Sequence, residues 1–162
     1  LQATLDHKGS GGLRALCLSK DRIITATGDR TAKIWLNSKP PGQADESWSW
    51  QHKFTLEGHS RPITEMCSCG NMLVTSSGQG SFKVWCLNKG TKVIETKGDL
   101  GSSFSTMCFG AGYNLMAPTR SNKIGIWTLA GLADSDADLG TLKIDAEHEF
   151  SARHNVRCMS GD

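Results

Sequence analysis

A two-part motif occurs three times in this chain at a nearly constant spacing. Its first part is an apolar-x-x-apolar-Cys run, and its second part is an apolar residue followed by Trp. The first apolar residues of the three runs are Leu13, Ile63 and Phe104. The tryptophans lie 22, 22 and 23 positions later, at Trp35, Trp85 and Trp127. A repeat of this period means that the fold is assembled from similar supersecondary units, which restricts the chain more than any local propensity does.

Each unit also contains short runs that favour extended strands. One run in each unit is rich in β-branched and aliphatic residues, at 22–27, 71–76 and 113–118. A further run follows each tryptophan, at 53–56, 92–96 and 142–145. Gly, Asn, Asp and Ser separate the runs, as expected for tight turns, and no long segment keeps the 3.6-residue period of a helix. The sequence therefore predicts an all-β fold of four-stranded antiparallel sheets.

A four-stranded sheet of this kind has two apolar faces and cannot bury either by itself. Radial stacking covers each face with the next sheet, which is the architecture of a β-propeller. We expect blades at residues 8–57, 58–98 and 99–150, a strand of a preceding blade at 1–7, and the start of the next blade at 151–162. Because a closed ring has about four to eight blades, we expect these three blades to be part of a larger ring. We expect the remaining blades to come from the same or another chain.

The units resemble the repeats of the WD-repeat family. The resemblance rests on Gly58-His59 at the start of a unit, on the turn formed by residues 27–31 (Thr-Gly-Asp-Arg-Thr), and on the strand that ends in Ile/Val-Trp. The family usually has an Asp directly after the tryptophan, and this chain has other residues there: Leu36, Cys86 and Thr128. The resemblance covers nearly the whole chain, and it implies the propeller fold.

The resemblance also implies a buried hydrogen-bonded set made of a His, a turn Asp, a strand Ser or Thr, and the Trp. The first unit supplies Asp29, Thr27 and Trp35. The second unit supplies His59, Ser77 and Trp85, and the third supplies Thr119 and Trp127. Other residues stand at the remaining positions of the set: Gly9, Gln79, Gly101 and Ser121. No unit is therefore complete by plain counting of offsets.

The six cysteines raise the question of a metal site or of disulfides. Three of them occupy one equivalent strand position, where a thiol serves as a small buried apolar group: Cys17, Cys67 and Cys108. The Cys-Ser-Cys sequence at 67–69 lacks a second pair at zinc-ligand spacing. A calcium-loop spacing that starts at Asp134 has Leu139 where the sharp turn needs Gly. We expect no metal and no cofactor, and the free thiols indicate an intracellular protein, cytoplasmic or nuclear.

Candidate partner-binding residues fall on two rims of the predicted propeller. One rim carries the connections between units and the turns after the second strands, with four polar candidates: Ser60, Arg61, Arg120 and Arg153. Arg is suited to bidentate recognition of carboxylate or phosphate. The opposite rim carries an acidic insertion at 129–140 and an insertion at 37–50 that contains Trp48 and Trp50. These two indoles share a face of an extended segment, and they either pack on the outer strand or anchor a partner.

Several functional classes find no support in the sequence. There is no phosphate-binding Gly-x-x-x-x-Gly-Lys-Ser/Thr loop, and no His-Ser-Asp or His-Cys arrangement stands outside the repeat positions. The net charge of +2 argues against a nucleic-acid clamp built on bulk charge. No apolar run approaches the roughly 18 residues of a membrane span. The sequence indicates neither an enzyme nor a membrane protein.

We therefore predict a non-enzymatic WD-repeat scaffold that binds other proteins, as a subunit or domain of a larger complex. The alternative is an RNA- or ribosome-associated propeller subunit that uses Arg61 and Arg120 on phosphates. Two narrower roles also remain open within the protein-binding class. They are a ubiquitin-ligase substrate adaptor and a cytoskeletal or motor-tail cargo module.

Overall fold

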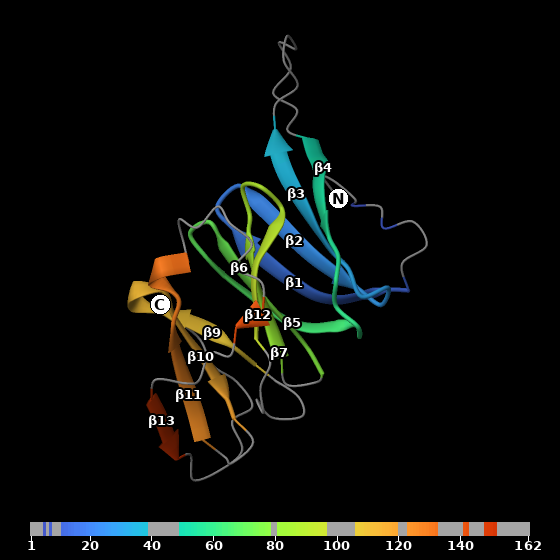
Figure 1. The fold of residues 1–162 in the computed structure, drawn as a ribbon. Helices are drawn as coiled ribbons and strands as arrows, with labels where there is room; N and C mark the ends of the chain where they lie inside the picture. Colours follow the sequence, from blue (N-terminus) through green and yellow to red (C-terminus); the bar gives the residue numbers. More distant parts are fainter. Residues whose placement is uncertain are drawn as a thin grey trace.

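The computed structural model describes residues 5, 7, 11–38, 49–78, 81–96, 106–119, 123–132, 141–142 and 148–151. The described regular structure consists of strands and two short 3-10 helices, η1 (Ala111–Tyr113) and η2 (Ala130–Leu132). Three sheets follow one another along the chain, and the second sheet lies between the first and the third (Figure 1). No helix in the described part of the chain has the length and apolar character needed to cross a membrane.

The three sheets share one strand order, which follows the sequence. The first contains β1 (Leu13–Ser19), β2 (Arg22–Thr27), β3 (Ala32–Ser38) and β4 (Ser49–Leu56). The second contains β5 (Ile63–Cys69), β6 (Met72–Ser77), β7 (Ser81–Cys86) and β8 (Thr91–Thr96). The third contains β9 (Cys108–Gly110), β10 (Asn114–Pro118), β11 (Lys123–Thr128) and β13 (His148–Ser151). All pairs within these sets of four are antiparallel, which confirms the predicted type of sheet.

The sequence motif has the same register in all three sheets. A cysteine on the first strand, an apolar residue on the second and the residue before Trp on the third are cross-strand neighbours. These rows are Cys17–Ile24–Ile34, Cys67–Val74–Val84 and Cys108–Met116–Ile126. The first two sheets also share β-bulges at matching positions, between Leu13 and Ala15 and between Ile63 and Glu65. Equivalent register and equivalent bulges show that the sequence repeats are structural repeats.

Two apolar cores lie between neighbouring sheets. The core between the first and second sheets includes Ile34, Leu56 and Leu73, none of them more than 1% exposed. The core between the second and third sheets includes Phe82 and Trp127, whose rings meet edge to face with centroids 5.8 Å apart. Burial of side chains of this size stabilises the fold by about 1.5–3 kcal/mol each. Because each core needs two sheets, the predicted all-β propeller architecture is confirmed by where the apolar side chains lie.

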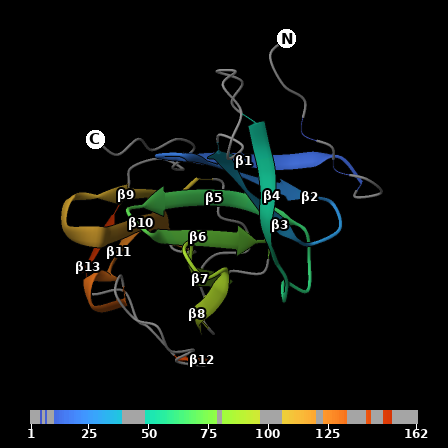
Figure 2. The same cartoon turned by 90° about the horizontal axis from the view of Figure 1, so that it is seen from above.

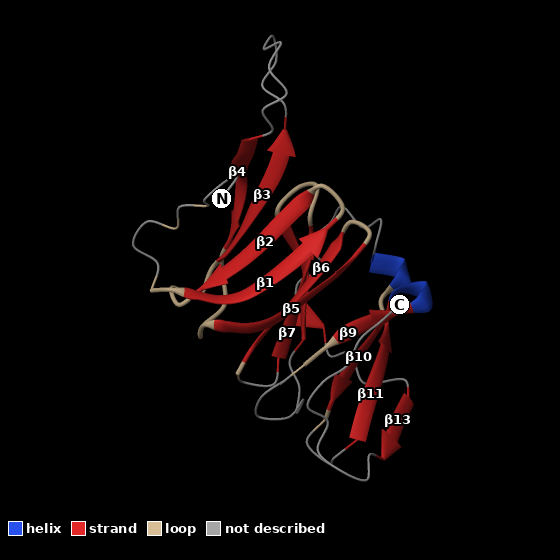
Figure 3. Cartoon of the chain, turned by 180° about the vertical axis from the view of Figure 1, so that it is seen from behind, coloured by secondary structure: helices blue, strands red, loops and turns tan. Residues whose placement is uncertain are grey.

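The outer strand of the third sheet differs from the prediction. The sequence analysis placed it at 142–145, whereas the strand that pairs with β11 is β13, at the sheet's outer edge in Figure 3. Thr141 and Leu142 form β12, a two-residue strand that pairs in parallel with β8 and extends the second sheet. Residues 142–145 (Leu-Lys-Ile-Asp) alternate apolar and polar residues, whereas 148–151 (His-Glu-Phe-Ser) do not. Periodicity therefore favoured the wrong run, because pairing is decided by which sheet edge each run reaches.

The inner strands of the first two sheets lie next to each other, and the far face of the first sheet has no described sheet on it (Figure 2). Three leucines of β1 are exposed as a result: Leu13 by 58%, Leu16 by 58% and Leu18 by 70%. On the opposite face of β1, the alternate residues Ala15 and Cys17 pack against the core shared with the second sheet. The first sheet therefore has an apolar face of the kind that another blade covers in a propeller.

Candidate functional site

The second sheet contains a buried hydrogen-bonded set centred on Thr75. The Trp85 indole N–H donates to the Thr75 hydroxyl at 2.7 Å, and Nε2 of His59 lies 2.7 Å from the same oxygen. Nδ1 of His59 lies 3.2 Å from the Ser77 hydroxyl. His59 is on the connection from β4 to β5, so this set ties that connection to the central strand β6. His59, Ser77 and Trp85 thus lie in one hydrogen-bonded set, in which Thr75 contacts both His59 and Trp85.

The electrostatics of His59 suit a structural role. Burial lowers its pKa to about 4, the nearby Lys83 ammonium acts in the same direction, and Glu95 opposes them. Lys83 is itself buried and forms an ion pair with Glu95. His59 is therefore neutral near pH 7, and both of its ring nitrogens are used in contacts with hydroxyls.

In the first sheet, the tryptophan contact and the turn contacts belong to two separate hydrogen-bonded groups. The Trp35 indole N–H donates to Thr25 at 2.8 Å. The Asp29 carboxylate instead holds the turn between β2 and β3, since it accepts bonds from the Thr27 hydroxyl at 2.6 Å and from the Thr31 hydroxyl at 2.8 Å. Partial burial raises the pKa of Asp29, but these bonds outweigh it and the pKa is lowered. The Trp35 ring also lies edge-on to His7, with centroids 5.1 Å apart.

The hydroxyl that contacts each tryptophan differs from the one expected. Counting along the sequence gave Thr27 and Ser77, whereas the tryptophans bond to residues two positions earlier, Thr25 and Thr75. Successive odd positions of a strand share one face, so both hydroxyls are available, and the indole reaches the diagonal neighbour on the adjacent strand. Register is a property of the sheet, and sequence offsets alone do not provide it.

The third sheet lacks this hydrogen bond. Ala117 stands where β6 has Thr75, and Trp127, although completely buried, has an indole nitrogen with no hydrogen-bond partner among the described residues. The predicted hydroxyl of this unit, Thr119, instead donates to the Lys123 carbonyl at 3.3 Å. The counterparts Gln79, Gly101 and Ser121 lie outside the described residues.

The candidate partner site is a polar pocket of about 390 Å³ on the rim beside His59. It lies between the β2–β3 turn and the β4–β5 connection, and its lining is Asp29, Arg30, Thr31, Glu57, Gly58 and His59. Two predicted residues, Ser60 and Arg61, follow directly in the sequence and are exposed. Arg30 was not identified from the sequence. The signal that could have found it is its place in a tight turn, where it adopts a φ of +72° that is uncommon for residues other than Gly.

The remaining predicted partner residues do not come together with this pocket. Trp50 lies on β4 and lines an apolar pocket of about 400 Å³ with Leu13, Leu16 and Ile23, on the free face of the first sheet. Trp48, Arg120 and Arg153 lie outside the described residues. Within the residues that the structure describes, no three His, Cys, Asp or Glu side chains gather as a set that could hold a metal ion.

Comparison with known sequences finds WD-repeat proteins. The family model "WD domain, G-beta repeat" matches residues 50–86, which run from β4 to β7. Human WD repeat-containing protein 97 is 27% identical over 136 residues, 82% of this chain and 7% of that protein. The human Denticleless protein homolog is 31% identical over 42% of this chain and 8% of its own length. The ribosome biogenesis protein YTM1 of Kluyveromyces lactis is 28% identical over 60% of this chain and 23% of its own length. The chain thus spans less than a quarter of each of these relatives.

Solved structures agree on the fold. The computationally designed Ika4 protein has a TM-score of 0.62 at 20% identity, covering 79% of this chain and 71% of Ika4. The designed Ika8 protein has a TM-score of 0.63 at 17% identity, covering 89% of this chain and 38% of Ika8. Both are designed propeller proteins. The chain therefore has the propeller fold, and its residues 50–86, which include the His59–Thr75–Trp85 set, are similar to a repeat of the WD-repeat family.

Proposed function

We propose that this chain is part of a non-enzymatic scaffold that binds other proteins at the rim carrying the pocket beside His59. One observation carries the proposal. Both loops that line this pocket are fixed by side-chain hydrogen bonds, one by Asp29 and the other by His59. A pocket with rigid walls binds a partner without the entropy cost of ordering its loops, which is how a propeller displays variable loops at fixed spacing.

A structural role for the titratable groups supports the non-enzymatic part of the proposal. The hydroxyls of Thr75 and Ser77 both contact His59, and Thr75 also accepts the Trp85 N–H. With a pKa near 4, His59 is a poor general base at neutral pH, because the most effective catalytic pKa lies near the working pH. WD-repeat proteins are generally scaffolds rather than enzymes.

The charges at the pocket favour a polypeptide partner over nucleic acid. Arg30 supplies a positive charge, while Glu57 and Asp29 supply negative ones, and Arg61 is exposed beside them. A phosphate backbone would meet two carboxylates here, whereas a peptide can present both signs of charge. Trp50, with Trp48, and the loop residues Ser60, Arg120 and Arg153 are further proposed contacts.

A second candidate is a role in a ribosome-assembly complex, where the rim would also contact RNA. The observation that favours it is the similarity to YTM1, whose name identifies a ribosome biogenesis protein. The similarity to the Denticleless protein homolog leaves the proposed ubiquitin-ligase adaptor role open as well. In either case we propose that the protein works inside the cell, because the described cysteines are free thiols.

The test is affinity capture from cell extract with a charge-matched control. The variant Arg30→Gly/Arg61→Ala removes two positive charges at the rim, and Gly suits the φ of +72° at position 30. The control Arg14→Ala/Lys53→Ala removes two positive charges from β1 and β4. We expect the rim variant alone to lose specific proteins from the wild-type capture, with the same loss when nuclease is added. Those proteins are then purified and their binding to the chain is measured directly.

Two outcomes would contradict the proposal. If both double variants capture the same proteins as the wild type, this rim is not the docking site. If nuclease abolishes the capture and binding falls linearly on a log–log plot against salt, the RNA-linked candidate is correct instead.

A further inference from the structure

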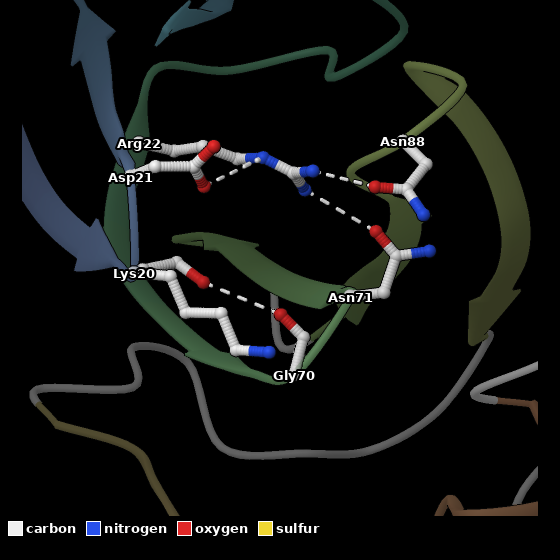
Figure 4. Close-up of a pocket in the computed structure, with 7 residues that line it drawn as sticks. Lys20, Asp21, Arg22, Gly70, Asn71 and Asn88 are labelled. Atoms are coloured by element: carbon white, nitrogen blue, oxygen red, sulfur yellow. Dashed lines mark hydrogen bonds and ion pairs between the residues drawn. The ribbon is translucent and has the colours of Figure 1, made fainter. Parts of the chain in front are cut away.

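A second polar pocket lies on the opposite rim, at the junction of the first two sheets (Figure 4). β2 begins at this pocket and ends at the turn that holds Asp29, so the two pockets are at opposite ends of one strand. The volume is about 130 Å³. Ser19, at the end of β1, lines the pocket and donates to the Gly70 carbonyl at 3.3 Å. The other lining residues come from the β1–β2 turn, the start of β2, the β5–β6 turn and the turn after β7: Lys20, Asp21, Arg22, Gly70, Asn71 and Asn88.

Arg22 crosses from the first sheet to the second and fixes the pocket. Its Nη1 donates to Oδ1 of Asn71 at 3.2 Å, and its Nη2 donates to Oδ1 of Asn88 at 2.5 Å. Nε lies 3.6 Å from the Asp21 carboxylate. A guanidinium can only donate, so it turns both amide oxygens toward itself and both amide NH₂ groups away. The NH₂ of Asn71 donates to the Cys86 sulfur at 3.3 Å, and that of Asn88 has no hydrogen-bond partner among the described residues.

Lys20 has a left-handed backbone conformation, which favours glycine. Its φ is +51°, and its counterpart in the next sheet, Gly70, has a φ of +56°. A Lys in this conformation is less stable than Gly, so local folding does not account for it. The side chain is exposed and extends toward the Gly70–Asn71 turn in Figure 4. Its ammonium has no ion pair or hydrogen bond among the described residues, and strained positions of this kind cluster at functional sites.

We infer that this pocket binds a single carboxylate of a partner protein, either an Asp or Glu side chain or a chain terminus. Lys20 and Arg22 provide two positive charges and Asp21 one negative charge. The pocket therefore has a net positive charge, which one carboxylate neutralises. The pocket is well below the roughly 300 Å³ at which small-molecule sites begin, so it accepts only a small terminal group. The Lys20 ammonium and the Asn88 NH₂ have no hydrogen-bond partner in the part of the chain that the structure describes, so both can donate, and a carboxylate has two acceptor oxygens.

A carboxylate fits better than a phosphate because Asp21 is beside the guanidinium. A phosphate monoester carries close to two negative charges at neutral pH and would repel that carboxylate more strongly. The inference rests on the proposed scaffold function. It specifies that a partner protein also places a carboxylate in this pocket, on the rim opposite the one beside His59. Its test is therefore separate from the capture experiment at Arg30 and Arg61.

The experiment is a titration of the ¹⁵N-labelled chain followed by NMR. The probes are the peptide acetyl-Gly-Asp-Glu-Asp-Gly-amide, its Asn/Gln counterpart, and inorganic phosphate. We expect the acidic peptide to shift the Asn88 side-chain NH₂ and the Lys20 and Asn71 backbone amides in a saturable way, with a Kd in the millimolar range. Lys20→Gly, which suits the turn, is expected to weaken binding about fivefold, the scale of one exposed ion pair. Arg14→Gln, with the same loss of charge on β1, is expected to change binding less than about twofold.

Three outcomes would overturn the inference. The acidic peptide gives no saturable shift at this pocket, Lys20→Gly weakens binding no more than Arg14→Gln does, or phosphate shifts the same signals at lower concentration than the peptide. A failure here together with partner loss in Arg30→Gly/Arg61→Ala would leave the scaffold function standing and remove only this site.

Discussion

Thr75 receives the Trp85 indole N–H at 2.7 Å, and this contact links the repeat motif of the sequence to the packing of the sheet. Thr75 lies on the central strand β6 and has no exposed surface, and Trp85 is 2% exposed. Its hydroxyl is shared with His59, so one oxygen joins a central strand, its neighbour and the connection from the preceding sheet. The equivalent Thr25 accepts the Trp35 indole N–H at 2.8 Å, and its hydroxyl donates to the Lys33 carbonyl at 3.5 Å rather than contacting a described histidine.

This difference predicts unequal effects of the same substitution. Thr75→Val keeps the shape of the side chain and removes the partner of both Trp85 and His59, so we expect a loss of about 2–4 kcal/mol in unfolding free energy. Thr25→Val removes the acceptor of Trp35 and should cost about 1–2 kcal/mol. Chemical denaturation followed by tryptophan fluorescence measures both. Equal losses would mean that the His59 contact contributes nothing to stability.

The third sheet allows the reverse experiment. Ala117→Ser places a hydroxyl near the unsatisfied Trp127 indole nitrogen, and satisfying a buried donor is worth about 1 kcal/mol. We expect the melting temperature to rise. The control is Ala26→Ser, at another completely buried alanine, on β2. No unsatisfied donor among the described residues is known beside Ala26, so the buried hydroxyl of this variant should lower stability. A fall in stability for Ala117→Ser similar to that of the control would show that the indole is already satisfied.

The low pKa of His59 predicts that stability depends on pH. The folded pKa is about 4 and the reference value is 6.5, so the unfolded state binds the proton more readily. The stabilisation is complete above pH 6.5 and is lost as the pH falls toward 4. Between pH 7.5 and 5 the expected loss is about 2 kcal/mol. Denaturation at several pH values measures it.

The variant His59→Gln isolates the histidine from other groups. Asp29 and Glu95 also have lowered pKa values, but their contribution is lost at more acidic pH than this interval. The variant is expected to be less stable overall and to have a flatter dependence on pH between 7.5 and 5. A slope as steep as that of the wild type would assign the pH dependence to other groups.

The sequence predicted those parts of the fold that depend on local pattern. The run at 22–27 is β2 itself, and the run at 71–76 differs from β6 by one residue. The three cysteines and the residues before the tryptophans were predicted to be equivalent, and their register confirms it. Period-two alternation and tight-turn residues encode these features directly, so a repeat can be aligned without coordinates.

Features that depend on contacts between distant segments were not predicted. Arg22 is 49 residues from Asn71 and 66 from Asn88, and no local pattern relates these positions. The same holds for Arg30, whose relevance comes from the β4–β5 connection that faces its turn. The predicted acceptors of the tryptophan N–H groups were two residues away from the observed ones. The prediction chose the correct face of the second strand, but the indole reaches a different cross-strand neighbour on that face. Packing between sheets and cross-strand geometry decide these contacts, and both arise only after the sheets associate.

The strained turn at Lys20 gives a final prediction, which is independent of any ligand. In a left-handed conformation Gly is favoured over other residues by about 1 kcal/mol, although it loses more entropy on folding. We therefore expect Lys20→Gly to raise the unfolding free energy by about 0.5–1 kcal/mol, and Lys20→Asn by less, since Asn tolerates this conformation. The matched change Gly70→Ala should destabilise the chain, because a Cβ at Gly70 would lie 2.8 Å from the Tyr113 hydroxyl in addition to the backbone strain. A gain in stability with a loss of carboxylate binding in Lys20→Gly would show that the lysine is retained for its charge. If Lys20→Gly instead destabilises the chain, the side chain supports the fold and the strain argument is wrong.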